Sequence, residues 1–420
     1  MKTLRFFIAI LLSPLMAAPV VAQTSDTLIC REMGGQGIAF TDGNRVELLM
    51  SGQQKFDRLF DDIRKARHSV HLEYFNFRND SIASLLFDIL REKRRQGVEV
   101  RALFDGFGND SNNQPLLKRH LQALRQDGID IHEFDPIRFP WINRIWPRDH
   151  RKIVVIDGCI AYTGGMNVAD YYINGTEQVG EWRDMHCRIQ GPAVNHLQHI
   201  LLRIWYQVTG TDLTTNPLYF QARPVSEGYR VAIINREPGT VVDTNGRLLG
   251  QNNIMRRFYV QALDAARDSV KIINPYFVLT ASINRAIKRA IRRGVQVDIM
   301  VSAKSDVPLT PDCVFYNAHR LMKKGARVWL YEPGFHHSKI MTVDGRFCTV
   351  GSANLDARSM RYDYEANALI LDTAVTAQLD SLFQADMQKS FRLTEQKWNQ
   401  WRNPWQKFRG WFGHLLRPVL

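Results

Sequence analysis

Two parts of the chain carry the same set of reactive residues at the same spacing. Both copies follow the pattern His-x-Lys-x4-Asp-x6-Gly-(Gly/Ser)-x-Asn. The first copy contains His150, Lys152, Asp157 and Asn167, and the second contains His337, Lys339, Asp344 and Asn354. A single histidine or lysine at the start of a strand is usually only solvated, but duplication in register indicates a shared chemical role.

The spacing within each copy predicts a site for a phosphate group. A His and a Lys two residues apart on a strand point to the same face, so both side chains can reach one anion. The apolar residues that follow Lys152 and Lys339 predict a buried strand, and the Gly-containing turn brings backbone and Asn donors close to the anion. Asp157 and Asp344 stand at the strand ends, where we expect them to hold the motif together by accepting hydrogen bonds.

One further acid in each part of the chain stands at the start of a strand-like run. These acids are Asp184, before Met185-His186, and Glu365, before Ala366-Asn367. A carboxylate behind a catalytic imidazole fixes its tautomer and orientation, so one acid in each half could orient a histidine. The alternative interpretation is an ordinary ion pair with a nearby arginine, and the sequence leaves both open.

The elements around the motifs repeat as well. Residues 66–70 (Ala-Arg-His-Ser-Val) recur as residues 266–270 (Ala-Arg-Asp-Ser-Val). After each, the pattern predicts a strand, an amphipathic helix, a glycine stop and a second strand, which make a β-α-β unit. We therefore expect an α/β fold of two pseudo-symmetric halves, each a mixed β-sheet flanked by helices, with one active site at their interface. The expected boundaries are 40–208 for the first half, 209–250 for a connecting segment, 251–395 for the second half and 396–420 for a tail.

The composition is that of a basic globular protein. Lys and Arg number 55 against 42 Asp and Glu among 420 residues, which gives a formal net charge of +13. This excess favours a polyanionic partner, either nucleic acid or an anionic membrane surface. The usage excludes a collagen, a coiled coil or a polytopic membrane protein. Five scattered cysteines with no zinc-type spacing predict neither a disulfide scaffold nor a metal site.

The amino terminus has the pattern of a secretory signal peptide. Lys2 and Arg5 precede an apolar run, and small residues follow before Gln23. Residues 1–22 are therefore expected to direct export, to the periplasm or the periplasmic face of a bacterial inner membrane. An uncleaved membrane anchor of the same length is the alternative, and Pro14 and Pro19 weaken it.

At this point the chain resembles the phospholipase D superfamily, and within it the bacterial cardiolipin synthases. The resemblance covers residues 44–391, and beyond the paired motif it rests on several shorter stretches. These are residues 44–49, 104–106, 182–186, 275–277, 304–306, 333–339, 356–359 and 365–367. Two features depart from the family pattern: the signal-like segment stands where many members have two transmembrane helices, and residues 361–364 replace a more apolar lead into Glu365.

The resemblance implies two phospholipase D-like halves and a metal-free, cofactor-free reaction. One histidine attacks the phosphodiester, and the other protonates the departing alcohol and then activates the incoming hydroxyl. We assign His150 as the nucleophile and His337 as the general acid by resemblance, and the opposite assignment stays open. The implied catalytic set is His150, Lys152, Asp157, His337, Lys339 and Asp344, with Asn167 and Asn354 binding substrate and Asp184 and Glu365 orienting the histidines.

The family substrate is phosphatidylglycerol, an anionic phospholipid that suits a basic protein acting at a membrane surface. Three activities stay in play: a cardiolipin synthase-like phosphatidyltransferase, a phospholipase D that hydrolyses lipids, and a nuclease of the same superfamily. The family-specific stretches favour lipid over nucleic acid, and the sequence says nothing of the oligomeric state.

Two apolar segments could contact lipid. The first flanks the motifs, where apolar side chains could form an entrance and Arg144 and Arg148 could hold the phosphate of a second lipid. Its apolar members are Phe139, Trp141, Ile142, Ile145, Trp146 and Phe335. The second is the tail, where Trp and Phe alternate with Lys and Arg as in an interfacial membrane segment. The alternative for the first is a loop packed on the domain, and for the tail a helix that caps the domain with its tryptophans.

Overall fold

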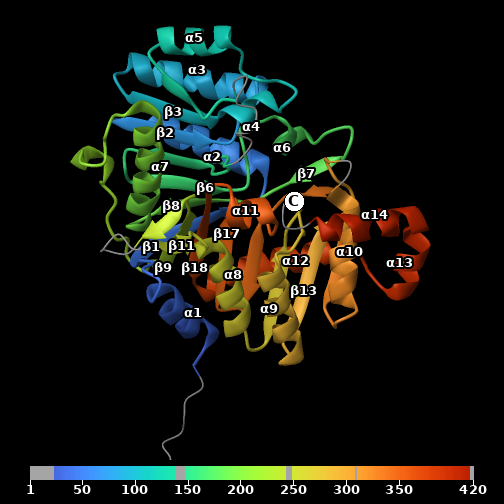
Figure 1. The fold of residues 1–420 in the computed structure, drawn as a ribbon. Helices are drawn as coiled ribbons and strands as arrows, with labels where there is room; N and C mark the ends of the chain where they lie inside the picture. Colours follow the sequence, from blue (N-terminus) through green and yellow to red (C-terminus); the bar gives the residue numbers. More distant parts are fainter. Residues whose placement is uncertain (1–22, 138–146, 243–247, 308–309, 417–420) are drawn as a thin grey trace, which may run out of the picture.

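Two similar α/β halves share one β-sheet in the computed structural model, which describes residues 23–137, 147–242, 248–307 and 310–416 (Figure 1). The sheet has 15 strands in the order β19-β14-β13-β12-β16-β17-β18-β9-β1-β8-β6-β5-β2-β3-β4. Its first-half strands are β1 (Phe40–Leu49), β2 (Ser69–Tyr74), β3 (Glu99–Asp105), β4 (Asp130–Phe134), β5 (Ile153–Ile156), β6 (Ile160–Gly164) and β8 (His186–Gln190). The second-half strands are β9 (Tyr229–Arg236), β12 (Ser269–Ile273), β13 (Gln296–Ser302), β14 (Arg327–Tyr331), β16 (Ile340–Val343), β17 (Phe347–Gly351), β18 (Glu365–Leu371) and β19 (Ser390–Arg392).

Helices cover both halves of this sheet. Those of the first half are α2 (Gly52–Lys65), α3 (Ser81–Arg95), α4 (Gly106–Asp110), α5 (Lys118–Gln126), α6 (Tyr171–Asn174) and α7 (Ala193–Thr209), followed by a 3₁₀ turn at Pro217–Tyr219. Helix α1 (Ser25–Gly34) precedes the first half in the chain and packs on the second. Those of the second half are α8 (Ile254–Ala265), α9 (Ala281–Arg292), α10 (Thr310–Met322), α11 (Ala357–Arg361), α12 (Thr373–Met387), α13 (Glu395–Trp401) and α14 (Pro404–Leu415). The predicted α/β class with two pseudo-symmetric halves is confirmed.

Both predicted β-α-β units are present. Strands β2 and β3 pair in parallel and are connected by α3, and β12 and β13 pair in parallel and are connected by α9. Asp80 begins α3 by accepting a hydrogen bond from the backbone N–H of Ala83, as an N-cap does. Gly97 and Gly294 follow the two helices with φ of 85° and 90°, a left-handed conformation in which glycine avoids the steric cost of a side chain. These glycines therefore stop the helices and return the chain to the sheet.

The halves join along β1 and β9, which pair antiparallel. Strand β9 lies within 209–250, so the segment expected only to connect the halves also supplies a strand at their junction. A shared hydrophobic core reinforces the junction, with Val155 and Ile189 from the first half and Val350 and Ala368 from the second in one buried cluster. Each half also has its own core on the outer side of the sheet. Because this core contains side chains from both halves, unfolding one half would expose apolar surface of the other, and the stabilities of the two halves are coupled.

Each motif occupies the start of a two-stranded hairpin, β5-β6 in the first half and β16-β17 in the second. Asp157 and Asp344 lie in the hairpin turns at φ of 50° and 52°. The Asp157 carboxylate accepts hydrogen bonds from the backbone N–H groups of residues 67–69, and the Asp344 carboxylate accepts them from residues 267–269. These carboxylates therefore tie each hairpin to the start of the neighbouring strand, β2 or β12, and neither lines the pocket described below.

The described residues test the predictions for the cysteines but not those for the amino terminus. Residues 1–22 lie outside the described residues. No helix in the described part of the chain is long and apolar enough to cross a membrane. All five cysteines lie in described segments and are free thiols, with Cys187, Cys313 and Cys348 buried.

Replacing a turn aspartate should cost stability. Asp157→Ala leaves three backbone N–H groups without their carboxylate, which should lower the free energy of unfolding by about 2–3 kcal/mol. Chemical denaturation measures this, with Asp61→Ala as the control, because Asp61 is exposed and pairs only with exposed Lys65. An unchanged unfolding free energy combined with lost turnover would instead mean that Asp157 acts on the substrate.

Candidate active site at the junction of the halves

Each motif histidine is held by a carboxylate from the opposite half. His150 Nδ1 lies 3.0 Å from Glu365 Oε1, and His337 Nδ1 lies 2.7 Å from Asp184 Oδ2. Glu365 begins β18 of the second half, and Asp184 lies two residues before β8 of the first. The two pairs cross the pseudo-symmetry axis, so neither half contains a complete pair.

Backbone hydrogen bonds enforce this crossing. The N–H of His150 donates to the carbonyl of Tyr364, and the N–H of His337 donates to the carbonyl of Arg183. Each carbonyl belongs to the residue immediately before the acid that holds the same histidine. The β7 (Glu181–Arg183) and β15 (Gly334–His336) strands extend this contact as a parallel pair. Main chain and side chain therefore position each histidine together.

This arrangement leaves Nε2 as the reactive nitrogen of each histidine. A carboxylate that accepts from Nδ1–H fixes the tautomer in which Nε2 carries the free lone pair. Both rings line a pocket of about 570 Å³ between the halves. No arginine of the described residues bonds to either carboxylate, so the geometry favours orientation of the histidines over an ion pair with arginine.

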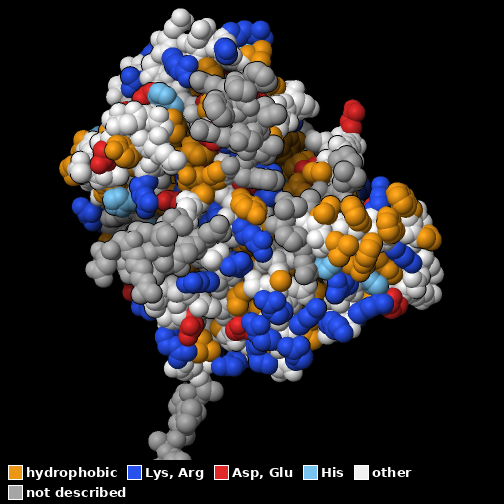
Figure 2. Space-filling model, in the orientation of Figure 1, with side chains coloured by type: hydrophobic (Ala, Val, Ile, Leu, Met, Phe, Trp, Pro, Cys, Tyr) orange, Lys and Arg blue, Asp and Glu red, His pale blue; other side chains and the backbone are white. Residues whose placement is uncertain are grey.

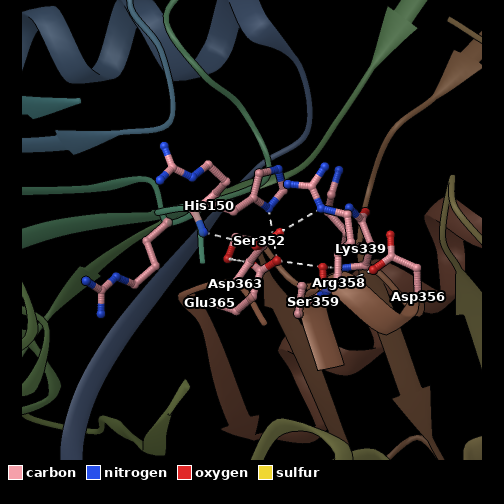
Figure 3. Close-up of polar contacts among 12 residues, drawn as sticks. His150, Lys339, Ser352, Asp356, Arg358, Ser359, Asp363 and Glu365 are labelled. Atoms are coloured by element: carbon pink, nitrogen blue, oxygen red, sulfur yellow. Dashed lines mark hydrogen bonds and ion pairs between the residues drawn. The ribbon is translucent and has the colours of Figure 1, made fainter. Parts of the chain in front are cut away.

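The two carboxylates have different neighbours. Glu365 also accepts hydrogen bonds from the hydroxyl groups of Ser352 and Ser359 (Figure 3). Gly165 occupies the position in the first motif that Ser352 occupies in the second. A β-carbon on Gly165 would collide with the Asp184 carboxylate. A serine therefore holds the glutamate of one pair, whereas the aspartate of the other pair leaves room only for a glycine.

The motif lysines lie beside their histidines. Lys152 Nζ donates to the carbonyl of His150 at 2.5 Å. Lys339 Nζ lies 3.0 Å from His337 Nε2 and 3.9 Å from Asp184 Oδ2. Two buried lysine side chains beside the pocket-lining histidines would stabilise the charge of a phosphate and of the five-coordinate transition state.

The two motif asparagines also face this pocket. Asn167 Oδ1 and Asn354 Oδ1 are buried and have no hydrogen-bond partner among the described residues. Their backbone N–H groups are held in matching ways, by the hydroxyl of Tyr172 and by that of Ser359. Their side-chain amides are therefore positioned for a bound ligand.

Burial and neighbouring charges shift the acid–base properties of the site. Burial, followed by the ammonium of the adjacent lysine, lowers the pKa of His150 and of His337 to about 4. Burial lowers the pKa of Lys152 to about 7 and that of Lys339 to about 8. Burial alone would raise the pKa of Glu365, but His150 and Lys152 outweigh it and lower this pKa to about 2. These pKa values predict neutral imidazoles beside an ionised Glu365 at neutral pH, and a bound phosphate anion would favour protonation of one imidazole.

Sequence reasoning missed a lysine beneath the first motif. Lys55 in α2 is fully buried, and its Nζ donates to the carbonyl of Asn167 at 2.9 Å. Burial holds the pKa of Lys55 well below its usual range. The position two hundred residues later in the repeat is Met255, so duplication gave no signal for it.

The expected phosphate-binding role of Arg148 is not supported. Its side chain is fully buried, and its guanidinium bonds to Asp135 Oδ2 at 2.6 Å. Its carbonyl accepts from Tyr364 N–H, so Arg148 braces the strand leading to His150 against the second half. Phe335 is buried beside Trp182 and His337 rather than exposed as an entrance. Arg144 lies outside the described residues, as do the remaining apolar flanking residues, Phe139, Trp141, Ile142, Ile145 and Trp146.

The remaining wall of the pocket is polar and aromatic. It contains Trp182 and Tyr276 next to His337, and the charged groups Asp306, Asp356 and Arg358. No group of three or more His, Cys, Asp or Glu side chains among the described residues is arranged to hold a metal ion.

Comparison with known proteins agrees with this geometry. A family model described as "Cardiolipin synthase, PLD-like domain" matches residues 59–205 and 259–387. A cardiolipin synthase of Oceanobacillus iheyensis is 35% identical over 381 residues, covering 91% of this chain and 76% of that protein. Cardiolipin synthase 2 of Staphylococcus epidermidis is 36% identical over 382 residues, covering 90% of this chain and 75% of that protein.

A solved structure shows the same fold. The phosphatidylserine synthase of Haemophilus influenzae superposes with a TM-score of 0.68 at 17% sequence identity, covering 93% of this chain and all of that one.

Removing the charge of one orienting carboxylate should impair turnover without unfolding the protein. Glu365→Gln keeps the shape but no longer favours the Nδ1–H tautomer of His150, so kcat should fall by roughly 10²–10⁴-fold with little change in KM. Steady-state kinetics measures this, with Glu47→Gln, an exposed carboxylate, as the control. A raised KM with an unchanged kcat would contradict the orienting role.

The two buried histidines should make stability sensitive to mild acid. Their folded-state pKa of about 4 lies below the unfolded value of 6.5, so the unfolded chain binds more protons between these pH values. Stability is therefore expected to fall as pH decreases from 6.5 towards 4. Thermal melts of the double variant His150→Gln/His337→Gln should show a smaller decrease over this window than the wild type, and identical slopes would refute the assignment.

Proposed function

The chain belongs to the cardiolipin synthase family of the phospholipase D superfamily, and from this premise we propose that it joins two phosphatidylglycerol molecules into cardiolipin and glycerol through a phosphatidyl-histidine. It is a cardiolipin synthase-like phosphatidyltransferase. The observation that carries the proposed mechanism is the pair of crossed histidine–carboxylate contacts around one pocket.

In the first step, His150 acts as the nucleophile. The lone pair on its Nε2 attacks phosphorus and forms a P–N bond, while the bond between phosphorus and the glycerol headgroup oxygen breaks. His337, protonated on Nε2, gives that proton to the departing glycerol. Lys152 and Lys339 offset the negative charge that grows on the phosphoryl oxygens.

In the second step, the roles reverse. Neutral His337 takes the proton of the glycerol hydroxyl on a second phosphatidylglycerol, and that oxygen attacks phosphorus. The P–N bond breaks, its electron pair returns to His150, and His337 is again protonated. One phosphodiester replaces another, so the overall exchange is nearly isoenergetic and needs no nucleotide cofactor.

The same proposal covers the partners and location. The substrate is an anionic phospholipid in a membrane, and we expect no nucleic-acid substrate. The signal-like residues 1–22 support export to the periplasm or the periplasmic face of the inner membrane.

Product analysis tests the transferase activity. Phosphatidylglycerol vesicles should yield cardiolipin and free glycerol, with phosphatidic acid as the minor product and no effect of EDTA. Net transfer over hydrolysis requires that the acceptor hydroxyl outcompetes water at the phosphatidyl-enzyme. Phosphatidic acid as the almost exclusive product at high phosphatidylglycerol would establish a phospholipase D instead.

A substrate with a good leaving group tests the role of each histidine. Phosphatidyl-p-nitrophenol needs no acid for the first step, so His337→Ala should still release a burst of p-nitrophenol and accumulate phosphatidyl-His150, detected by mass spectrometry. His150→Ala should give neither burst nor adduct. An adduct on His337 in the His150→Ala variant would reverse the assignment.

A further inference from the structure

Helix α14 exposes its apolar side chains to solvent. The exposed fractions of Trp405, Phe408, Trp411, Phe412 and Leu415 range from 44% for Trp411 to 63% for Trp405. Their spacing of three and four residues places them along one side of the helix. Figure 2 shows apolar side chains gathered over α14, with Lys and Arg side chains on the same face of the molecule below them. Such a contiguous apolar patch on a folded protein marks an interaction surface.

The opposite side of α14 is built to dock on α10. A β-carbon on Gly410 would collide with the backbone of Asp312, and one on Gly413 would press against Cys313. His414 is buried and its Nδ1 lies 2.8 Å from Asn317 Oδ1. The helix therefore places small and polar residues inward and aromatic residues outward, the reverse of a helix that caps a core.

Capping is done by the preceding helix instead. Trp398 of α13 is 5% exposed and stacks on His319 at 4.2 Å between ring centroids. Trp401 packs against Phe315 at 4.6 Å. The two interpretations of the tail thus apply to different helices. Helix α13 fulfils the capping role, whereas the ring contacts of the α14 aromatics within the described chain are with one another.

Charge and position identify the occupant of this surface. Residues 404–415 contain no Asp or Glu and include two cations, Lys407 and Arg409, of which Arg409 also pairs with Asp312 of α10. Aromatic residues interleaved with cations on a surface helix are the composition that binds the interface of an anionic bilayer. The helix is also linked to the substrate pocket, because Val307 lines that pocket and is exposed, and α10, on which α14 packs, begins at Thr310.

We propose that the outward face of α14, defined by Trp405, Phe408, Trp411, Phe412 and Leu415, inserts into the interfacial region of an anionic phospholipid membrane and holds the pocket at the lipid surface. This inference rests on the proposed function, because it takes the substrate to be a membrane lipid. It adds that substrate access depends on a docking helix at the opposite end of the chain from the signal-like segment.

Vesicle binding and monomer turnover test the proposal separately. The variant Trp405→Glu/Phe412→Glu should bind vesicles of phosphatidylglycerol and phosphatidylcholine roughly 100-fold more weakly in co-sedimentation, since each buried aromatic contributes roughly tenfold. Its turnover of short-chain phosphatidylglycerol below the micellar concentration should equal that of the wild type. Leu218→Glu is the matched control, because Leu218 is 56% exposed on the first half and should not alter binding.

The outcomes distinguish the docking proposal from the proposed function. Unchanged vesicle binding by the α14 variant would overturn the docking proposal, as would a wild-type dimer that this variant converts to a monomer in sedimentation velocity. Equal loss of binding in pure phosphatidylcholine vesicles would overturn the preference for anionic lipid. Failure of the wild type to turn over monomeric phosphatidylglycerol would contradict the proposed function and leave the vesicle-binding comparison intact. The far-ultraviolet circular dichroism of each variant should match that of the wild type, since the substituted side chains are exposed.

Discussion

The crossing of the two histidine–carboxylate pairs is the constraint on which the rest of the site depends. Each histidine takes its carboxylate from the other half, and each receives a main-chain hydrogen bond from the residue before that carboxylate. A half folded alone would hold a histidine without its acid and an acid without its histidine. Both halves must therefore be assembled before either histidine is oriented.

The sheet supplies the geometry that makes the crossing possible. Strands β18, β9, β1 and β8 run side by side across the junction. Glu365 is the first residue of β18, and Asp184 lies two residues before β8. The hairpin turns, which Asp157 and Asp344 tie to the neighbouring strands, fix β5 and β16, and each of these strands begins directly after a motif lysine. A site for one phosphate thus results from two hairpins held in register by a continuous sheet, with the lysines and asparagines of both halves facing the same space.

The sequence predicts the motif, the β-α-β units and the candidate acids because each is a local pattern that occurs twice. It does not predict which half each acid serves, because that depends on pairing across β1 and β9, which no short-range pattern encodes. Lys55 was not predicted for the opposite reason, since it is one of many polar residues in α2 and its repeat counterpart is Met255. Arg148 looked like a phosphate ligand beside the motif, yet burial next to Asp135 makes it a structural brace.

In the tail, composition alone could not separate the buried Trp398 from the exposed Trp405, because the glycine-containing face of α14 packs inward and its aromatic face points outward.

Nuclear magnetic resonance of the histidine side chains in ¹⁵N-labelled protein tests the crossing most directly. The account predicts two Nδ1–H resonances shifted downfield by strong hydrogen bonds to carboxylates. Glu365→Gln should remove the shift of His150 and leave that of His337, and Asp184→Asn should do the reverse, with His150→Gln and His337→Gln giving the assignments. Loss of the His337 shift in Glu365→Gln, with that of His150 retained, would show that each half orients its own histidine and would contradict the account.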